Sequence, residues 1–161
     1  MDGMESIDPT AAVCWKTSDF DALGASGIYR VLRARVAVFI IEQDCPYQEL
    51  DGLDEQAIHL WAESSDGALL AYARLLPPGT SYVEASIGRV LTTMAGRRRG
   101  LGRELMQRAL AESAARFPDL GIRISAQAYL LRFYTELGFE RVRGPYLEDG
   151  IPHLEMLRVP D

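Results

Sequence analysis

The order of the regular elements predicts a mixed α/β domain, of the α+β type, whose helices pack on a central, mixed but mostly antiparallel sheet. An early group of short apolar β-like runs contains a hairpin, and the second half of the chain alternates strand and helix. With 161 residues, 48% of them apolar, the chain is long enough for one hydrophobic core. We therefore expect a single domain over residues 1–161, with residues 1–10 flexible and about six to seven strands.

Apolar spacing and turn residues define the expected elements of the first half. Apolar side chains recur every three or four residues over 21–41, which is the pattern of a helix. The acidic segment 44–56 contains proline and glycine and is expected to form a loop. The runs 57–64 and 68–75 flank Asp66-Gly67, a pair that tolerates positive φ and favours a β-hairpin.

The second half contains the clearest helix, over residues 102–117. One apolar stripe runs along it, and Pro118 ends it. A shorter helix is expected over 128–137, with Gly138 as the residue that follows its C-terminus. The expected strands are residues 12–17, 57–64, 68–75, 82–93, 121–127, 139–145 and 152–159, the last two joined by residues 146–151.

Composition excludes two classes of partner. The net charge of −6, with 25% charged residues, is that of an ordinary acidic protein. Proteins that bind nucleic acid are usually basic overall, so we expect no nucleic-acid partner. No apolar run approaches the roughly 20 residues that span a bilayer, so we expect no membrane partner. The acidic N-terminus resembles neither a signal peptide nor a transit peptide, which favours the cytoplasm.

The cysteines and histidines do not have the spacing of a metal site. Cys14, Cys45, His59 and His153 form neither CxxC nor HExxH patterns, and we expect no metal. Disulfides are rare in cytoplasmic proteins, so both cysteines are expected as free thiols. His59 lies within an apolar run and is expected to be structural.

A glycine- and arginine-rich turn, residues 97–103, lies between an expected strand and the start of the helix 102–117. Glycines let backbone N–H groups approach an anion closely, and the first turn of a helix offers unsatisfied donors and the positive end of its dipole. Such a turn on an acidic protein suits one small polyanion. The alternative is a solvated basic turn, which is the commoner role of a charge run.

This turn, Arg97-x-x-Gly100-x-Gly102, fits the R/Q-x-x-G-x-G/A motif, and the chain resembles the GNAT acyltransferase superfamily. Gln127, Phe133-Tyr134 and Gly138-Phe139 match the companion motif of that superfamily. Ordered blocks from about Val38 to His153 are more narrowly similar to its ElaA-like branch.

The resemblance implies a site for acetyl-CoA. Backbone N–H groups of the turn would hold the pyrophosphate, and the preceding strand would pair with the pantetheine arm. That pairing needs an open strand edge, so the sheet should splay between its fourth and fifth strands, with helices on both faces. The implied cofactor-binding residues are Val90, Leu91, Thr92, Arg97, Arg98, Arg99, Gly100, Leu101, Gly102, Arg103, Gln127 and Tyr134. Gln127 stands where many relatives have Asn, and its alternative role is to cap the helix 128–137.

The resemblance places Tyr134 beside the CoA sulfur, where a phenol can donate a proton as the thiolate leaves. The alternative is that Tyr134 and Phe133 are both core aromatics. An amine must lose a proton to attack, and His153 and Glu42 are the candidate bases, with Glu84, Glu148 and Asp149 as further candidates.

The resemblance therefore implies an N-acyltransferase that moves an acetyl group from acetyl-CoA directly to a primary amine in a ternary complex. Its acceptor would be a small-molecule or peptide amine, and the protein a monomer or homodimer. The alternative is a non-catalytic CoA-binding module. The acidic segment 49–55 either steers a cationic amine or is solvated, and Arg74 and Arg89 either bind an acceptor carboxylate or brace the strands.

Overall fold

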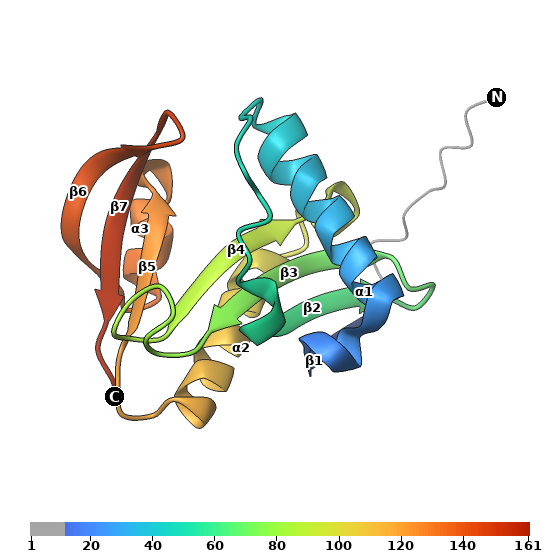
Figure 1. Ribbon diagram of the computed structural model, residues 1–161, viewed down its shortest axis with the longest axis horizontal. Coiled ribbons are helices and arrows are strands. Elements are labelled where there is room, and N and C mark those ends of the chain that lie inside the picture. Colours follow the sequence, from blue (N-terminus) through green and yellow to red (C-terminus); the bar gives the residue numbers. More distant parts are fainter. Residues whose placement is uncertain (1–11) are drawn as a thin grey trace.

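Two antiparallel sheets stand side by side in the computed structural model, which describes residues 12–161 (Figure 1). The expected flexibility of residues 1–10 lies outside this range. The first sheet has the order β1-β2-β3-β4 and the second β5-β7-β6. The strands are β1 (Val13–Asp19), β2 (Ile58–Ser64), β3 (Leu69–Leu76), β4 (Ser86–Thr92), β5 (Ile122–Gln127), β6 (Glu140–Glu148) and β7 (Ile151–Arg158).

The two sheets are joined by strand pairing at one point and then diverge. Ala85, just before β4, forms a parallel bridge with Ile122, and the Arg123 N–H donates to the Ala85 carbonyl at 2.9 Å. Beyond this bridge, β4 and β5 make no further strand pairing within residues 12–161, and Figure 1 shows them separating along their length. The expected splay between the fourth and fifth strands is confirmed.

A β-bulge in β4 accompanies the divergence. Tyr72 pairs with Leu91 and Arg74 with Gly88, so two residues of β4 face the single residue Ala73. One of the two, Arg89, has a φ of +51°. Bulges increase local twist, and this one bends β4 away from the second sheet. No local pattern predicts this bulge, because Arg89 lies in an otherwise regular β-like run.

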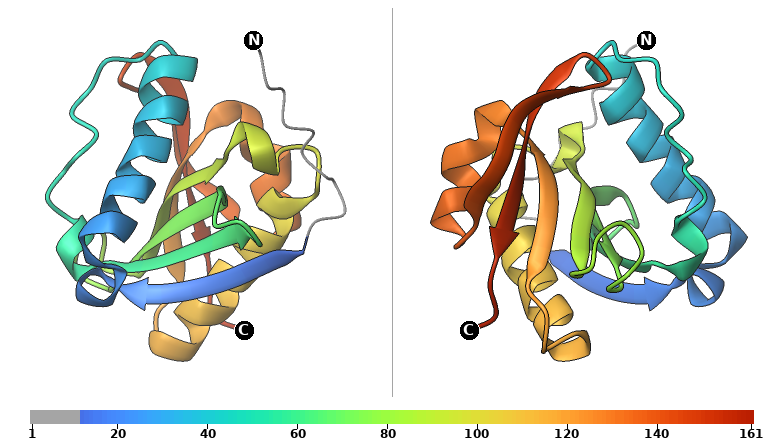
Figure 2. Two further views of the ribbon diagram at one scale, coloured as in Figure 1. Left: turned by 90° about the vertical axis from the view of Figure 1, so that its right-hand side faces the viewer. Right: turned by 60° about the vertical axis from the view of Figure 1, so that its left-hand side comes forward.

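Helices cover both faces of the first sheet, as Figure 2 shows. On one face, α1 (Phe20–Arg35) continues into a π-helical segment (Val36–Glu42) and packs its buried Val31 against Trp61 and Tyr72. On the other face, α2 (Leu101–Arg116) buries Leu105 and Met106 completely. The remaining helical segments are α3 (Leu131–Glu136) and 3-10 turns at Asp54–Gln56, Met94–Gly96 and Ala128–Leu130.

The largest differences from the expected elements lie in the second half of the chain. The helix predicted over 128–137 is divided into a 3-10 turn and α3, and the strand predicted over 82–93 begins only at Ser86. The connection predicted over 146–151 is wrong, since β6 continues to Glu148 and turns back at Asp149-Gly150. That pair has φ values of +50° and +77°, which suits a tight hairpin turn.

Candidate active site

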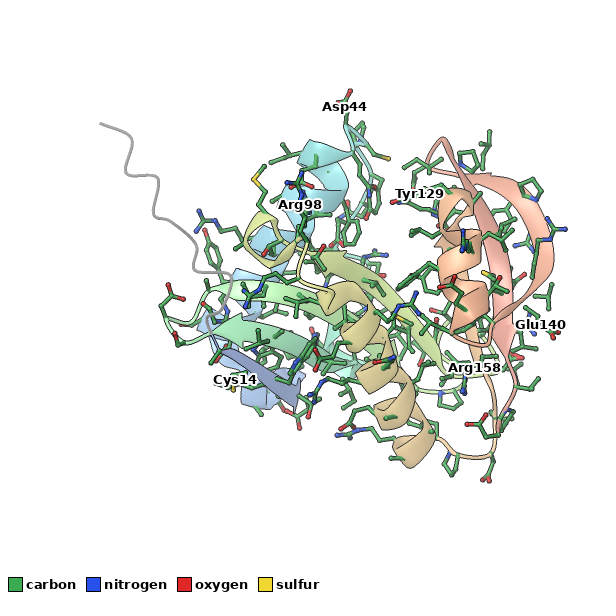
Figure 3. The ribbon with its side chains drawn as sticks, turned by 180° about the vertical axis from the view of Figure 1, so that it is seen from behind. Cys14, Asp44, Arg98, Tyr129, Glu140 and Arg158 are labelled. Atoms are coloured by element: carbon green, nitrogen blue, oxygen red, sulfur yellow. The ribbon has the colours of Figure 1, made fainter. Side chains whose placement is uncertain are left out.

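A cleft of about 490 Å³ occupies the opening between β4 and β5. Both sheets line it, together with the segment that follows α1 and the β6–β7 turn. Arg98 and Tyr129 stand on opposite sides of the opening, next to the lining residues Arg97 and Leu130 (Figure 3). No helix in residues 12–161 is long and apolar enough to cross a membrane.

The turn of residues 97–103 meets the cleft at Arg97, which is the one residue of the turn that lines it. Arg98 and Gly100 both have left-handed backbone conformations, with φ of +62° and +71°. Gly100 is the N-cap of α2 and supplies no side-chain cap, so no cap covers the first N–H groups of the helix. A Cβ on Gly102 would meet only Thr92 Cγ2, at 3.9 Å. Protein packing therefore does not require this glycine, which leaves room for a ligand against the helix N-terminus.

Two arginines of the turn are paired with carboxylates of the protein. Arg97 donates to Glu42 at 2.5 Å and to the Thr92 carbonyl at 3.2 Å. Arg103 donates to Glu136 at 2.6 Å. The structure thus brings Glu42 to the turn, and Glu42 is not among the described residues that line the cleft.

The predicted pantetheine strand lines the cleft through Val90, Leu91 and Thr92. Its edge toward β5 has no strand partner beyond the bridge at Ala85 among the described residues. Backbone N–H and C=O groups on an unpaired edge can bind an extended chain as though it were another strand.

Gln127 lies at the end of β5, facing the cleft. Its side-chain nitrogen donates to the Gln43 Oε1 at 3.2 Å, which joins β5 to the end of the π-helical segment across the cleft. Its alternative role as a helix cap is wrong, because Gln127 makes no side-chain cap bond to the turn that follows.

Tyr134 presents its hydroxyl group to the cleft from α3. Only 6% of the residue is exposed, and its ring makes edge contacts with Phe133 and Phe139 at centroid distances of 5.1 and 5.8 Å. No described residue hydrogen bonds to its hydroxyl. Burial raises the pKa of Tyr134 to about 12. The ring is therefore a core aromatic, and the hydroxyl is a neutral donor facing the cleft.

His153 lies on β7 opposite Gln127 and also lines the cleft. Its Nδ1 is 2.7 Å from the Ile151 carbonyl, which only accepts, so we assign the hydrogen to Nδ1. Its Nε2 is 3.2 Å from Glu148, and its ring stacks on Tyr146. This tautomer leaves Nε2 as the nitrogen that can accept a proton.

A buried network of ion pairs holds the loop 44–56, which forms one wall of the cleft. Arg35, fully buried at the end of α1, binds Glu49 at 2.7 Å and Asp54 at 2.5 Å. Arg74 on β3 binds Asp51 at 2.7 Å and Asp54 at 3.1 Å. The carboxylates of the loop 44–56 therefore hold it at the cleft through their ion pairs with Arg35 and Arg74.

The bulge residue Arg89 joins the same network, with its side chain 2.5 Å from Glu49 and 3.3 Å from Asp51. Burial alone would raise the pKa of Asp51, but hydrogen bonds and charge from Arg74 outweigh it and lower the pKa to about 2. Arg74 and Arg89 therefore tie the loop 44–56 to β3 and β4, and within the described residues they form no ion pair across the splay to β5.

Sequence reasoning missed Arg35 and interpreted the acidic segment as solvated or steering. The available signal was the position of Arg35, one helical turn after the buried Val31 on the same face. A buried cation needs a carboxylate partner, and the loop 44–56 is the acidic segment that follows this helix. His59 is structural as expected, since it is buried and bonds to Tyr72 at 2.7 Å.

Both cysteines are free thiols, as expected. Cys14 is exposed, whereas Cys45 is buried and lines the cleft. The Cys45 thiol donates to the Asp149 carbonyl at 3.3 Å, so it links the segment after α1 to the β6–β7 turn.

Comparison with known proteins identifies the family. A model of the acetyltransferase (GNAT) domain matches residues 19–159. A UPF0039 protein of Synechocystis is 43% identical over 147 residues, covering 91% of this chain and 96% of that protein. The crystal structure of an acyl-CoA N-acyltransferase from Pseudomonas aeruginosa is 43% identical, with a TM-score of 0.87 and coverage of 92% of this chain and 100% of that one.

The crystal structure of ElaA from Escherichia coli is 37% identical, with a TM-score of 0.85 and coverage of 91% of this chain and 99% of that chain. The splayed sheets, the glycine turn at the start of α2 and these likenesses agree. The chain therefore belongs to the GNAT family of N-acyltransferases, in its ElaA-like branch.

Proposed function

We propose that this N-acyltransferase moves an acetyl group from acetyl-CoA directly to a primary amine, with both substrates bound in the cleft. One observation carries the proposal. The cleft between β4 and β5 joins an uncapped helix N-terminus to a buried phenol whose hydroxyl has no partner among the described residues. A carrier molecule with a polyanionic group at one end, an extended arm and a reactive group at the other end would match these three features in order.

The residues fit an acyl-CoA at each of its parts. The N–H groups of residues 97–103 would bind the pyrophosphate, and the open edge over residues 90–92 would pair with the pantetheine amides. Gln127 would bind the arm after exchanging its bond to Gln43. When bound, acyl-CoA supplies an activated thioester carbonyl to the amine.

Tyr134 is the proposed proton donor. Its raised pKa keeps the hydroxyl group protonated at neutral pH, so it can donate to the thiolate as the C–S bond breaks. His153 is the proposed acceptor of the amine proton through Nε2, and Glu148 stabilises the imidazolium that results. Glu42 is also a candidate base. We propose instead that it holds Arg97 in place in the cradle, the turn of residues 97–103 that would bind the pyrophosphate.

Free thiols at Cys14 and Cys45 agree with the reducing cytoplasm, where we propose that the protein acts.

The experiment is to follow thiol release from acetyl-CoA in the presence of a panel of amines, with CoA affinity measured in parallel. We expect saturable thiol release that depends on both enzyme and amine. Saturable CoA binding without thiol release from any amine would contradict the proposal and favour the non-catalytic CoA-binding module.

A further inference from the structure

We call the part of the cleft formed by the loop 44–56 and the β6–β7 turn its amine side. The unpaired charge that faces the cleft on this side is negative. The two guanidinium groups there are neutralised. Arg74 is 3% exposed and donates to both oxygens of Asp51, at 2.8 and 2.7 Å. Arg89 is paired with Glu49 and Asp51 and also donates to the Glu49 carbonyl at 3.0 Å. Neither has its charge available for a carboxylate on the acceptor.

The two carboxylates of the β6–β7 turn are less fully paired than these arginines. Glu148 lines the cleft with a half-exposed side chain whose ionic partner is His153. Asp149 also lines the cleft, and its carboxylate makes no ion pair or hydrogen bond within residues 12–161. Its backbone is held at the cleft by the Cys45 thiol, at 3.3 Å.

Aromatic hydroxyl groups lie among these carboxylates. Tyr47 and Tyr82 both line the cleft. Burial raises the pKa of Tyr82 to about 12, with further contributions from Tyr146, Glu155 and Glu148. Burial likewise raises the pKa of Tyr47, with Asp149 among the charges that act on it. Both phenols therefore stay neutral, and their oxygens and ring faces suit a cation.

A second, independent feature marks this cleft as a ligand site. Tyr134 is 6% exposed and lines the cleft, and its hydroxyl has no described partner. The acyl donor, entering past the cradle, would place its reactive carbon near this group. The acceptor must then occupy the remaining side, which is the side with the unpaired carboxylate of Asp149.

From this distribution of charge we infer that the acceptor belongs to the diamine or polyamine class. It carries a second, positively charged amino group in addition to the amine that reacts, and it has no carboxylate near the reacting amine. The inference rests on the proposed function and narrows its substrate class. Asp149 and Glu148 attract the distal ammonium group. The charges of Arg74 and Arg89 are already balanced by carboxylates of the loop, and the Nε atoms that lack a hydrogen-bond partner are buried, so neither side chain presents a free charge to an amino acid's carboxylate.

The test compares acceptors of one chain length: 1,4-diaminobutane, 1-aminobutane and 4-aminobutanoate, each with acetyl-CoA at constant ionic strength. We expect kcat/KM for the diamine to exceed that for 1-aminobutane at least tenfold and to exceed that for 4-aminobutanoate by more. Equal values, or preference for 4-aminobutanoate, would overturn the inference.

A charge variant locates the effect. Asp149→Asn should bring the ratio of kcat/KM between the diamine and 1-aminobutane toward one. Asp119→Asn removes the same charge from an exposed turn after α2 and should leave that ratio unchanged. A ratio that is equally reduced in both variants, or in neither, counts against the assignment to Asp149.

A binding measurement separates this inference from the proposed function. If no amine releases thiol, the proposed acetyl transfer fails, and the thermal shift of the CoA complex decides the inference. A stabilisation by 1,4-diaminobutane that 4-aminobutanoate does not produce, and that Asp149→Asn abolishes, supports a cation site. No stabilisation by the diamine, or an equal one by 4-aminobutanoate, rejects it.

Discussion

The two sides of the cleft are built in different ways. The cradle is one contiguous turn, residues 97–103, that uses backbone conformation and the end of α2. The amine side is assembled from α1, the loop 44–56, β3, the bulge of β4 and the β6–β7 turn, and it uses side-chain charge. Under the proposed function, binding of acyl-CoA would depend on local backbone conformation, whereas binding of a particular acceptor would depend on long-range packing.

The largest effect should come from the buried network on the amine side. Arg35→Met leaves Glu49 and Asp54 with one buried cation fewer, and removal of one partner from a buried ion pair costs about 3–5 kcal/mol. Urea denaturation should report this loss of unfolding free energy. The control is Arg116→Gln, which breaks an exposed pair with Glu112 and should cost about 0.5 kcal/mol or less. Similar losses in the two variants would contradict the network's role.

The next effect belongs to the reacting end of the cleft. Tyr134→Phe removes only the hydroxyl that has no described partner, so kcat should fall about a hundredfold, as for loss of a general acid, while CoA affinity stays within about twofold. Steady-state kinetics and a CoA titration measure both quantities. Tyr129→Phe alters an exposed tyrosine of the preceding turn and serves as the control. An unchanged kcat in Tyr134→Phe would remove that residue from the mechanism.

The amine side should also respond to acid. Because the folded-state pKa of Asp51 is lowered to about 2, its ion pair contributes stability that is present above pH 4 and is lost as the pH falls toward 2. The melting temperature should therefore decline below pH 4. In Asp51→Asn the protein should be less stable at neutral pH and the decline shallower, as followed by circular dichroism. A decline as steep as that of the wild type would show that Asp51 does not contribute.

The difference between the two sides also explains what the sequence could predict. The glycine turn, the splay and the position of Tyr134 follow from local patterns and the family resemblance. Arg97 of that turn, residues of β4 and β5, and Tyr134 line one cleft. The bulge at Arg89 and the pairing of Arg35 with Glu49 depend on contacts between distant segments. No local pattern distinguishes a solvated acidic loop from one whose carboxylates form buried ion pairs with distant arginines.

The β6–β7 turn was missed for a different reason. Asp149-Gly150 is a hairpin signal of the same kind as Asp66-Gly67, yet Pro145 nearby argues against a continuous strand. Because β6 is an edge strand, it tolerates that proline and continues to Glu148. Pro145 can be interpreted correctly only when β6 is known to be an edge strand, and that depends on contacts between distant segments.

The measurement that tests the central claim most directly is a calorimetric titration of CoA into two cradle variants. Arg98→Asn/Arg99→Gln removes two positive charges and keeps a residue that tolerates the left-handed conformation of Arg98. Gly102→Val fills the space against the first turn of α2, where a Cβ would meet only Thr92 within the protein. Its melting temperature should stay within a few degrees of the wild type.

If the backbone N–H groups hold the pyrophosphate, the arginine variant should weaken CoA binding by less than about tenfold and Gly102→Val by about a hundredfold or more. The reverse order, with severe loss in the arginine variant and near-normal binding in Gly102→Val, would show that side-chain charge holds the cofactor and would contradict a backbone cradle.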